Sequence, residues 1–203
     1  GIWKTTDYGT NWKPVFETQS ASSVSALAVS QSAPNEMWAG TGETFLIRPA
    51  HAMGDGIYKS TDYGDTWQKA GLETTGRIGQ INVHPRNPDV VYACSMGHSY
   101  GPQEERGVYR TKDGGETWEL VLHVNEQTGC ADLDMDPNNP STIFAAFWQL
   151  RIDTWGLNSG GPHSGVYRSD DGGDTWEKLS GVGRGLPGSE DHHVGKVSVR
   201  VAP

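Results

Sequence analysis

Carboxylate side chains are the residues of this sequence best suited to chemistry. At a glycosidic bond, Asp and Glu work in pairs, with the two carboxyl groups standing roughly 5 to 9.5 Å apart. No spacing in the sequence singles out one such pair. The candidates lie where the chain is expected to leave a strand or to line a channel: Glu43, Asp55, Glu104, Asp132, Asp134 and Asp153.

Some of these carboxylates are tied to predicted strands. Glu43, in GTGE, directly follows a predicted strand, and an anchored carboxylate is better placed for acid–base work than one at a loop tip. Asp132 and Asp134 alternate with Leu133 and Met135, so both project from one face of a strand. We expect them to line a channel, either as its wetted wall or as a catalytic pair, and the wall is the favoured interpretation.

A second group of candidates lies in long polar connections at 41–55, 97–106 and 149–164. Connections of this length inside a compact fold are often functional. Aromatic, arginine and carboxylate side chains together suit sugar rings and equally suit a peptide, although each residue alone could simply be solvated. The candidate ligand-binding residues are Arg48, His51, His98, Tyr100, Arg106, Arg151, Trp155 and His163.

Metal chemistry is not predicted. The stretch SEDHHVGK places Glu190, Asp191, His192 and His193 together, but adjacent histidines seldom converge on one ion. The acidic cluster at 170–174 lacks the alternating oxygen ligands and terminal Glu of an EF-hand loop. Cys94 and Cys130 have no metal-site spacing; they could form one disulfide between neighbouring repeats, and two unpaired thiols is the favoured interpretation. We predict no cofactor.

An internal repeat organises the elements that must position these residues. TTDYGTNW at 5–12, STDYGDTW at 60–67, TKDGGETW at 111–118 and SDDGGDTW at 169–176 are four copies of one motif. Each follows a G-[IV]-[WY]-[KR] segment, and the period is about 50 to 58 residues, which is typical of propellers, solenoids and arrays.

Every part of this motif has a structural task. Its Asp can accept backbone hydrogen bonds within its own turn. Its Gly permits positive φ, and its Trp can wedge between sheets. We therefore interpret the motif as a hairpin staple rather than a catalytic or metal site. The residues concerned are Asp7, Gly9, Trp12, Asp62, Gly64, Trp67, Asp113, Gly115, Trp118, Asp171, Gly173 and Trp176.

Each repeat is predicted to form four short strands. In the third repeat they cover 77–83, 90–95, 107–111 and 117–122, with the motif as the hairpin between the last two. The chain would then hold two strands of a first blade (1–17), three whole blades (23–70, 77–122 and 128–180) and the first strand of a fifth (192–203). Open edges at both ends would need the remaining blades of a parent chain, or a partner chain, to close the ring.

The four copies resemble Asp-box (BNR) repeats, which occur in sialidases, xyloglucanase-type glycoside hydrolases, sortilin-like receptors and a photosystem assembly factor. The repeat spacing and the HPRNPD-type turns are most similar to large bacterial secreted proteins described as BNR-repeat glycosyl hydrolases or as sortilin-like. The resemblance covers nearly the whole chain. It implies an all-β fold, a β-propeller of four-stranded antiparallel blades, with the boxes at the periphery. It also implies a secreted, cell-surface or periplasmic protein.

Composition narrows the range of partners. With a net charge of −9, the chain lacks the clustered Lys and Arg that a phosphate backbone requires, so nucleic acid is not predicted as a partner. No apolar run approaches the length of a membrane helix, so membrane insertion is not predicted either. The resemblance implies glycan-directed recognition or hydrolysis, with a polysaccharide or glycoconjugate as ligand; the alternatives are a non-catalytic module that binds a protein or peptide, and an architectural repeat.

Overall fold

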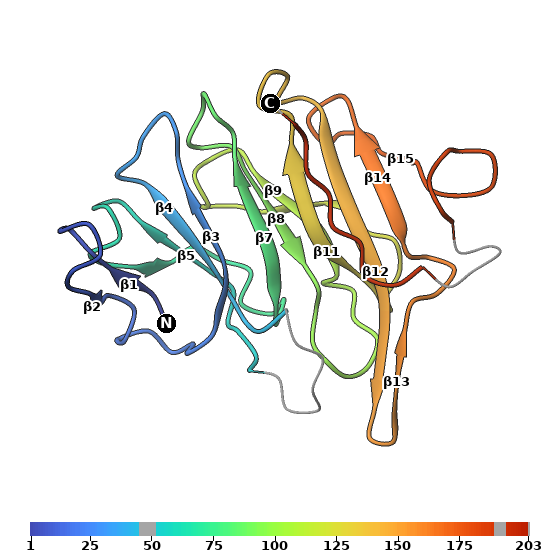
Figure 1. Cartoon of the computed structure of the whole chain (residues 1–203), viewed down its shortest axis with the longest axis horizontal. Helices are drawn as coiled ribbons and strands as arrows, with labels where there is room; N and C mark the ends of the chain where they lie inside the picture. Colours follow the sequence, from blue (N-terminus) through green and yellow to red (C-terminus); the bar gives the residue numbers. More distant parts are fainter. Residues whose placement is uncertain (45–51, 189–193, 203) are drawn as a thin grey trace.

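Four antiparallel β-sheets make up the structure, a computed structural model that describes residues 1–44, 52–188 and 194–202 (Figure 1). The first sheet holds β1 (Trp3–Lys4) and β2 (Lys13–Pro14). The second holds β3 (Val24–Val29), β4 (Met37–Thr41), β5 (Ile57–Ser60) and β6 (Gln68–Lys69). The third holds β7 (Ile78–Val83), β8 (Val91–Ser95), β9 (Gly107–Thr111) and β10 (Glu119–Leu122). The fourth holds β11 (Thr128–Met135), β12 (Ile143–Asp153), β14 (Gly165–Ser169) and β15 (Glu177–Lys178), with β13 (Gly156–Ser159) paired to β12.

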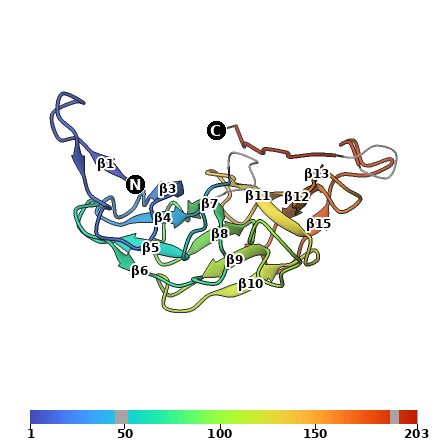
Figure 2. The same cartoon turned by 90° about the horizontal axis from the view of Figure 1, so that it is seen from below.

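The sheets are arranged as blades of a β-propeller, which confirms the predicted fold class. In each four-stranded blade the strands pair in chain order. Figure 2 shows β3, β7 and β11 on one side of the molecule and β6 and β10 on the other, so the first strand of each blade is innermost. The blades do not close into a ring, and the chain forms part of a propeller.

Each innermost strand carries a bulge at the same place. The pairing register shifts between Val24 and Ala26 in β3, and the same shift recurs in β7 and β11. The extra residues are Ser25, Gly79 and Ala131. A β-bulge bends its strand and re-aims the neighbouring side chains. A Cβ on Gly79 would lie 2.9 Å from the carbonyl oxygen of Ala131, so only glycine lets β7 approach β11 this closely.

In the third and fourth blades, the connections between the second and third long strands lie at one end of the molecule, the lower end in Figure 1. We call this end the loop end. The connection expected at 149–164 is not a loop throughout. Strand β12 continues to Asp153 and pairs with β13, with Asp153 opposite Gly156, to form a projecting hairpin. Leu150 and Ile152 are buried while Arg151 and Asp153 are exposed, which is the alternation of a strand.

The repeated motif forms a loop at the opposite end of each blade; we call these four segments (5–12, 60–67, 111–118 and 169–176) the box loops. In the second, Asp62 Oδ1 accepts the Thr66 backbone N–H at 2.8 Å, and the Ser60 hydroxyl accepts the Gly64 N–H at 2.8 Å. Gly64 has a φ of 80°. The loop therefore satisfies its own polar groups.

Neighbouring blades contact each other through two sets of side chains, one that reaches forward to the next blade along the chain and one that reaches back. A cation from the third strand of one blade reaches the box loop of the next. The contacts are Lys4 with the Asp65 carboxylate (2.9 Å), Lys59 with the Gly114 carbonyl (3.3 Å) and Arg110 with the Gly172 carbonyl (2.6 Å).

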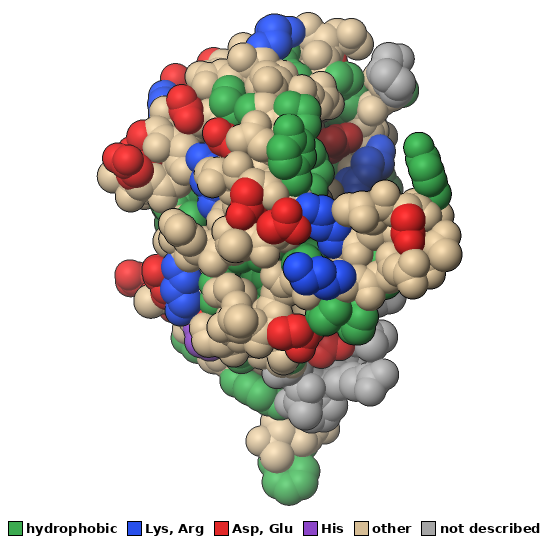
Figure 3. Space-filling model, turned by 90° about the vertical axis from the view of Figure 1, so that its left-hand side faces the viewer, with side chains coloured by type: hydrophobic (Ala, Val, Ile, Leu, Met, Phe, Trp, Pro, Cys, Tyr) green, Lys and Arg blue, Asp and Glu red, His purple; other side chains and the backbone are tan. Residues whose placement is uncertain are grey.

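In return, the box tryptophan packs back on the preceding blade. Trp67 meets the Phe16 ring edge-on at 5.7 Å, and Trp118 meets Trp38 in the same way at 6.1 Å. No earlier blade stands before the first box loop in the described residues, and Trp12 is 56% exposed where Trp67 is 6% exposed. Figure 3 views this end of the molecule and shows hydrophobic side chains at the surface among charged ones.

A disulfide adds a covalent link between the third and fourth blades. Cys94 of β8 and Cys130 of β11 are bonded, with their Cα atoms 5.0 Å apart. The favoured interpretation of two unpaired thiols is therefore wrong. Both side chains are fully buried in the cluster shared by the two sheets, and this packing sets their approach.

Residues 194–202 run beside the inner strand β11 (Figure 2). We expected a strand of a fifth blade over 192–203, but the described part of this segment belongs to no strand. Its Val199 and Val201 N–H groups instead donate to the carboxylates of Asp132 (3.1 Å) and Asp134 (2.7 Å). The carboxylates of β11 thus replace the backbone acceptors that a neighbouring strand would supply.

Candidate functional site at the loop end

The three innermost strands enclose a cavity of about 600 Å³. The bulged residues Ser25, Gly79 and Ala131 all line it, so the repeated bulge shapes its wall. Four ionisable side chains also line it: Glu43, Asp132, Lys196 and Arg200. It thus brings together two of the predicted carboxylates, from different blades. We call it the channel cavity.

Glu43 is held at the rim of the channel cavity by the end of β4. The preceding residue, Gly42, has a φ of 98°, and a Cβ there would lie 2.6 Å from the carbonyl oxygen of Gly76. The Glu43 N–H donates to the Ala52 carbonyl at 2.9 Å, and its carboxylate accepts the Ala52 N–H at 3.4 Å. The backbone of Glu43 is therefore fixed as expected for a residue that directly follows a strand.

Asp132 is the most buried carboxylate of the cavity, at 5% exposure. It accepts hydrogen bonds from the Leu133 and Val199 N–H groups and from the Arg200 guanidinium at 2.8 Å. Its charge is therefore balanced within the site. Asp134 lies elsewhere, in a smaller cavity of about 210 Å³. The two aspartates do not share one cavity.

Lys196 and Arg200 are site residues that the sequence did not single out. Burial lowers the pKa of Lys196, whose ammonium group lies 5.9 Å from the Trp148 ring centroid and bonds the Thr44 carbonyl at 3.4 Å. The signal for Arg200 was its alignment: in VRVAP it occupies the column of Asn82 and Asp134. Two acids and two bases make a polar cavity suited to a ligand rich in hydroxyl or amide groups.

Asp55 lies in a different hydrogen-bond network. Its carboxylate pairs with Lys69 at 2.8 Å and accepts the hydroxyls of Tyr58 and Ser20. Burial acts to raise the pKa of Asp55, but these partners outweigh it and lower the pKa. The network ties the second blade to the segment that precedes it, through Ser20.

Two of the predicted ligand-binding residues hold the loop at 97–106 in place. The buried Arg106 guanidinium donates to the His98 and Gly101 carbonyls at 3.1 Å and to the Gln127 carbonyl at 3.4 Å. The His98 ring contacts the Thr74 carbonyl at 3.2 Å. A second buried arginine, Arg77, also bonds the Gly97 and His98 carbonyls.

The remaining described candidates lie at the surface of the loop end. Arg151 and Asp153 form an ion pair on the projecting hairpin, and Trp155 stands at its turn. Tyr100 and Glu104 are exposed on the neighbouring loop, and His163 follows the hairpin. Arg48, His51 and the stretch from Glu190 to His193 lie outside the described residues.

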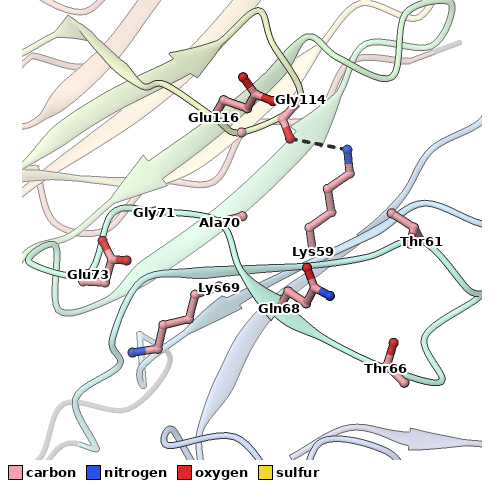
Figure 4. A pocket seen from close by; sticks show the side chains of 11 residues that line it. Lys59, Thr61, Thr66, Gln68, Lys69, Ala70, Gly71, Glu73, Gly114 and Glu116 are labelled. Carbon is pink, nitrogen blue, oxygen red and sulfur yellow. Dashed lines mark hydrogen bonds between the residues drawn. The ribbon is translucent and has the colours of Figure 1, made fainter.

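A pocket of about 500 Å³ at the periphery contains none of the predicted site residues other than the box glycine Gly115 (Figure 4). It lies between β6 and the third box loop, where Lys59 reaches the Gly114 carbonyl. Its lysines are already paired, Lys59 with Glu36 and Lys69 with Asp55. The pocket therefore belongs to the contact between blades.

Two further observations concern only the residues that the structure describes. Among them, no three His, Cys, Asp or Glu side chains are grouped so that they could hold a metal ion. No helix in this part of the chain has the length and hydropathy needed to cross a bilayer.

Sequence relatives of the chain include two xyloglucanases. It is 23% identical over 198 residues to one from a Paenibacillus species, a match covering 88% of this chain and 18% of the relative. It is 25% identical over 201 residues to one from Acetivibrio thermocellus, covering 88% of this chain and 22% of the relative. The chain thus spans about a fifth of the length of the curated relatives it matches.

Solved structures of similar shape include the GH74 enzyme of Niastella koreensis, with a TM-score of 0.63, 19% identity and coverage of 88% of this chain and 26% of that one. They also include the GH74 xyloglucanase of Xanthomonas campestris, with a TM-score of 0.61, 16% identity and coverage of 92% of this chain and 27% of that one. At these identities the likeness establishes a shared fold. The family model described as Sortilin, neurotensin receptor 3 matches residues 1–146 and 55–186. The predicted resemblance to sortilin-like and glycoside-hydrolase propellers is thereby confirmed, and the chain belongs to the Sortilin-Vps10 family.

Proposed function

We propose that this chain is part of an extracellular propeller protein that recognises or hydrolyses a glycan at the loop end. The observation that carries the proposal is the channel cavity, which is lined by carboxylates from two blades and has room for sugar units. The xyloglucanase relatives favour a polysaccharide as ligand. A buried disulfide favours an oxidising compartment, and so a secreted, cell-surface or periplasmic protein.

Within this proposal Glu43 is the stronger candidate for acid–base chemistry. Its backbone is fixed, and among the described residues its carboxylate accepts one long hydrogen bond, from the Ala52 N–H. Asp132 is engaged by Arg200 and two backbone N–H groups, so it suits a stabilising role. Asp55, Glu104, Asp134 and Asp153 lie outside the channel cavity and would need a ligand that extends beyond it.

The second candidate function is peptide binding without turnover, as the family membership suggests. One observation favours it. Asp132 and Asp134 hold alternate N–H groups of the extended segment 194–202, so the inner strand already binds one extended chain. A ligand peptide would use the same kind of contact.

The test is to incubate the intact protein that contains this chain with xyloglucan, other β-glucans and α-glucans, and to measure new reducing ends. We expect release from a β-glucan, and loss of about a hundredfold or more in rate in Glu43→Gln, as is typical when a general acid or base is removed. Glu116→Gln, at an exposed residue of the third box loop and outside the cavity, is the matched control. If a glycan binds without release, the site is for recognition; if only peptides bind, the glycan proposal is wrong.

A further inference from the structure

The projecting hairpin is firmly based. Leu150 and Ile152 of β12 pack with Met96 and Trp148 in one buried cluster. Four residue pairs join β12 to β13, ending at Asp153 and Gly156. The hairpin is therefore an extension of the fourth blade rather than a free loop, and side chains on it are held in place.

The hairpin forms one wall of a pocket of about 230 Å³. The opposite wall is the loop at 99–102, and Gln127 closes the base. Arg106, only 1% exposed, fixes these parts together, because its guanidinium donates to carbonyls of both the loop and Gln127. A second, more open hollow of about 520 Å³ shares Gln127 and continues past Gln149 and His163. The two hollows adjoin at Gln127, and together they are called the groove.

The side chains along this groove are those that read sugars. Arg151 and Asp153 project from the same face of β12 and pair at 3.0 Å, which offers a donor and an acceptor side by side for neighbouring hydroxyls. Gln127 and Gln149 add amide groups that both donate and accept, and they lie within 3.4 Å of each other.

Two exposed aromatic side chains belong to the segments that form the groove walls, although neither is among its lining residues. Trp155 is 94% exposed at the hairpin turn, and Tyr100 is half exposed on the opposite loop. The hairpin extends beyond the rest of the molecule with a hydrophobic tip at the lower end of Figure 3. Trp155 belongs to none of the buried clusters of the described residues, so it does not contribute to their hydrophobic cores. An exposed indole on a rigid support is a stacking platform for a flat apolar face.

We propose that this groove is a second glycan-binding site, separate from the channel cavity, and that it takes a β-linked chain of pyranose rings. One ring would stack on Trp155, while the next places neighbouring hydroxyls against Arg151 and Asp153. The equatorial substituents of β-glucans leave flat C–H faces for the indole. The proposal rests on the proposed function in taking a glycan as the ligand.

The test measures binding separately from hydrolysis. The intact protein is titrated with cellohexaose by calorimetry, with maltohexaose, an α-linked chain, as the comparison ligand. To keep the ligand intact, the titration uses the Glu43→Gln background. We expect binding of cellohexaose, weakened about tenfold or more in Trp155→Ala and in Arg151→Met, because a central aromatic or arginine contact carries that share of affinity. Maltohexaose should bind at least about tenfold more weakly.

Tyr63→Ala is the matched control, since Tyr63 is also an exposed aromatic side chain but lies in the second box loop, and this variant should bind cellohexaose as the parent does. Unchanged affinity in both Trp155→Ala and Arg151→Met would overturn the second site while leaving the proposed function intact. Loss of binding in those two variants, with no hydrolysis of any glycan by the wild type, would support the second site and reject catalysis. Absence of glycan binding by the wild type would overturn both.

Discussion

The aspartate of each box loop is a surface residue whose environment favours its charged form. For Asp62, the Thr66 hydroxyl, the Thr66 N–H and the Ser60 hydroxyl all donate to the carboxylate and lower its pKa from 3.8 to about 2. Asp7 and Asp171 are held in the same way, with pKa values of about 2. The repeat thus places an aspartate with a lowered pKa in the box loops of several blades.

A pH dependence of folding follows from Asp62. Because its folded pKa lies below the unfolded value, its contribution to stability is complete above about pH 4 and is lost as the pH falls through about 2. We expect Asp62→Asn to be less stable than wild type at pH 6, and the difference to shrink towards pH 2. Urea unfolding of both proteins across this range measures it. A difference that stays constant with pH would show that the carboxylate charge is not what matters.

At the scale of elements, the disulfide is a covalent cross-link between two blades in addition to the chain itself. It joins β8 to β11 and closes a loop across a sequence separation of 36. A cross-link of this span restricts the unfolded chain, and the gain is typically about 2–4 kcal/mol. Within the described blades, the third and fourth are therefore expected to unfold together.

Replacing both cysteines tests this coupling. The double variant Cys94→Ala, Cys130→Ala should lose about 2–4 kcal/mol of unfolding free energy relative to wild type in urea. Unfolding of the wild type with dithiothreitol present is the control, and it should approach the variant. Equal stability of variant and oxidised wild type would mean that packing alone holds the two blades.

Sequence alone located the elements better than the contacts between them. The strands predicted at 77–83, 90–95, 107–111 and 117–122 coincide with β7 to β10, because alternating side chains and turn residues are local signals. The hairpin within 149–164 was not predicted, because the segment is polar and rich in glycine. The alternating apolar residues Leu150 and Ile152 were too short a pattern to indicate a strand. The disulfide depended on how two blades pack, and no local pattern encodes that distance.

The candidate site was foreseen in part. Glu43 and Asp132 were named from their strands, and both line the channel cavity. Arg106 was named for ligand binding because it lies in a long polar connection, yet its side chain is buried and donates to three backbone carbonyls. Lys196 reaches the cavity only because segment 194–202 lies beside β11, a long-range placement that spacing cannot reveal.

On the scale of the whole molecule, box tryptophans are the packing contacts that bind each blade to the one before it. Trp67 is buried against Phe16, whereas Trp12, in the same motif, has no blade to pack on in the described residues. The same tryptophan of the motif therefore contributes differently to the free energy of unfolding in different blades. This makes the two tryptophans a matched pair.

The pair gives a direct prediction for the chain as described. Trp67→Ala should cost about 3–5 kcal/mol of unfolding free energy, as large-to-small changes in a core do. Trp12→Ala should cost clearly less, because 56% of its surface is exposed and it packs on no other blade in the described residues. Urea unfolding measures both. Similar costs for the two variants would contradict the assignment of box tryptophans to contacts between blades.

The contacts between blades also have a direction. Lys4, Lys59 and Arg110 each reach forward to the next box loop, and Trp67 and Trp118 each reach back. The series of blades therefore has a direction, and its two ends present different contact surfaces. When a whole repeat is added or removed, each Lys or Arg of the third strand still faces the box loop of a following blade. When only part of a repeat is added or removed, this match is lost. Gene duplication would then change the length of such a protein only in steps of one complete blade.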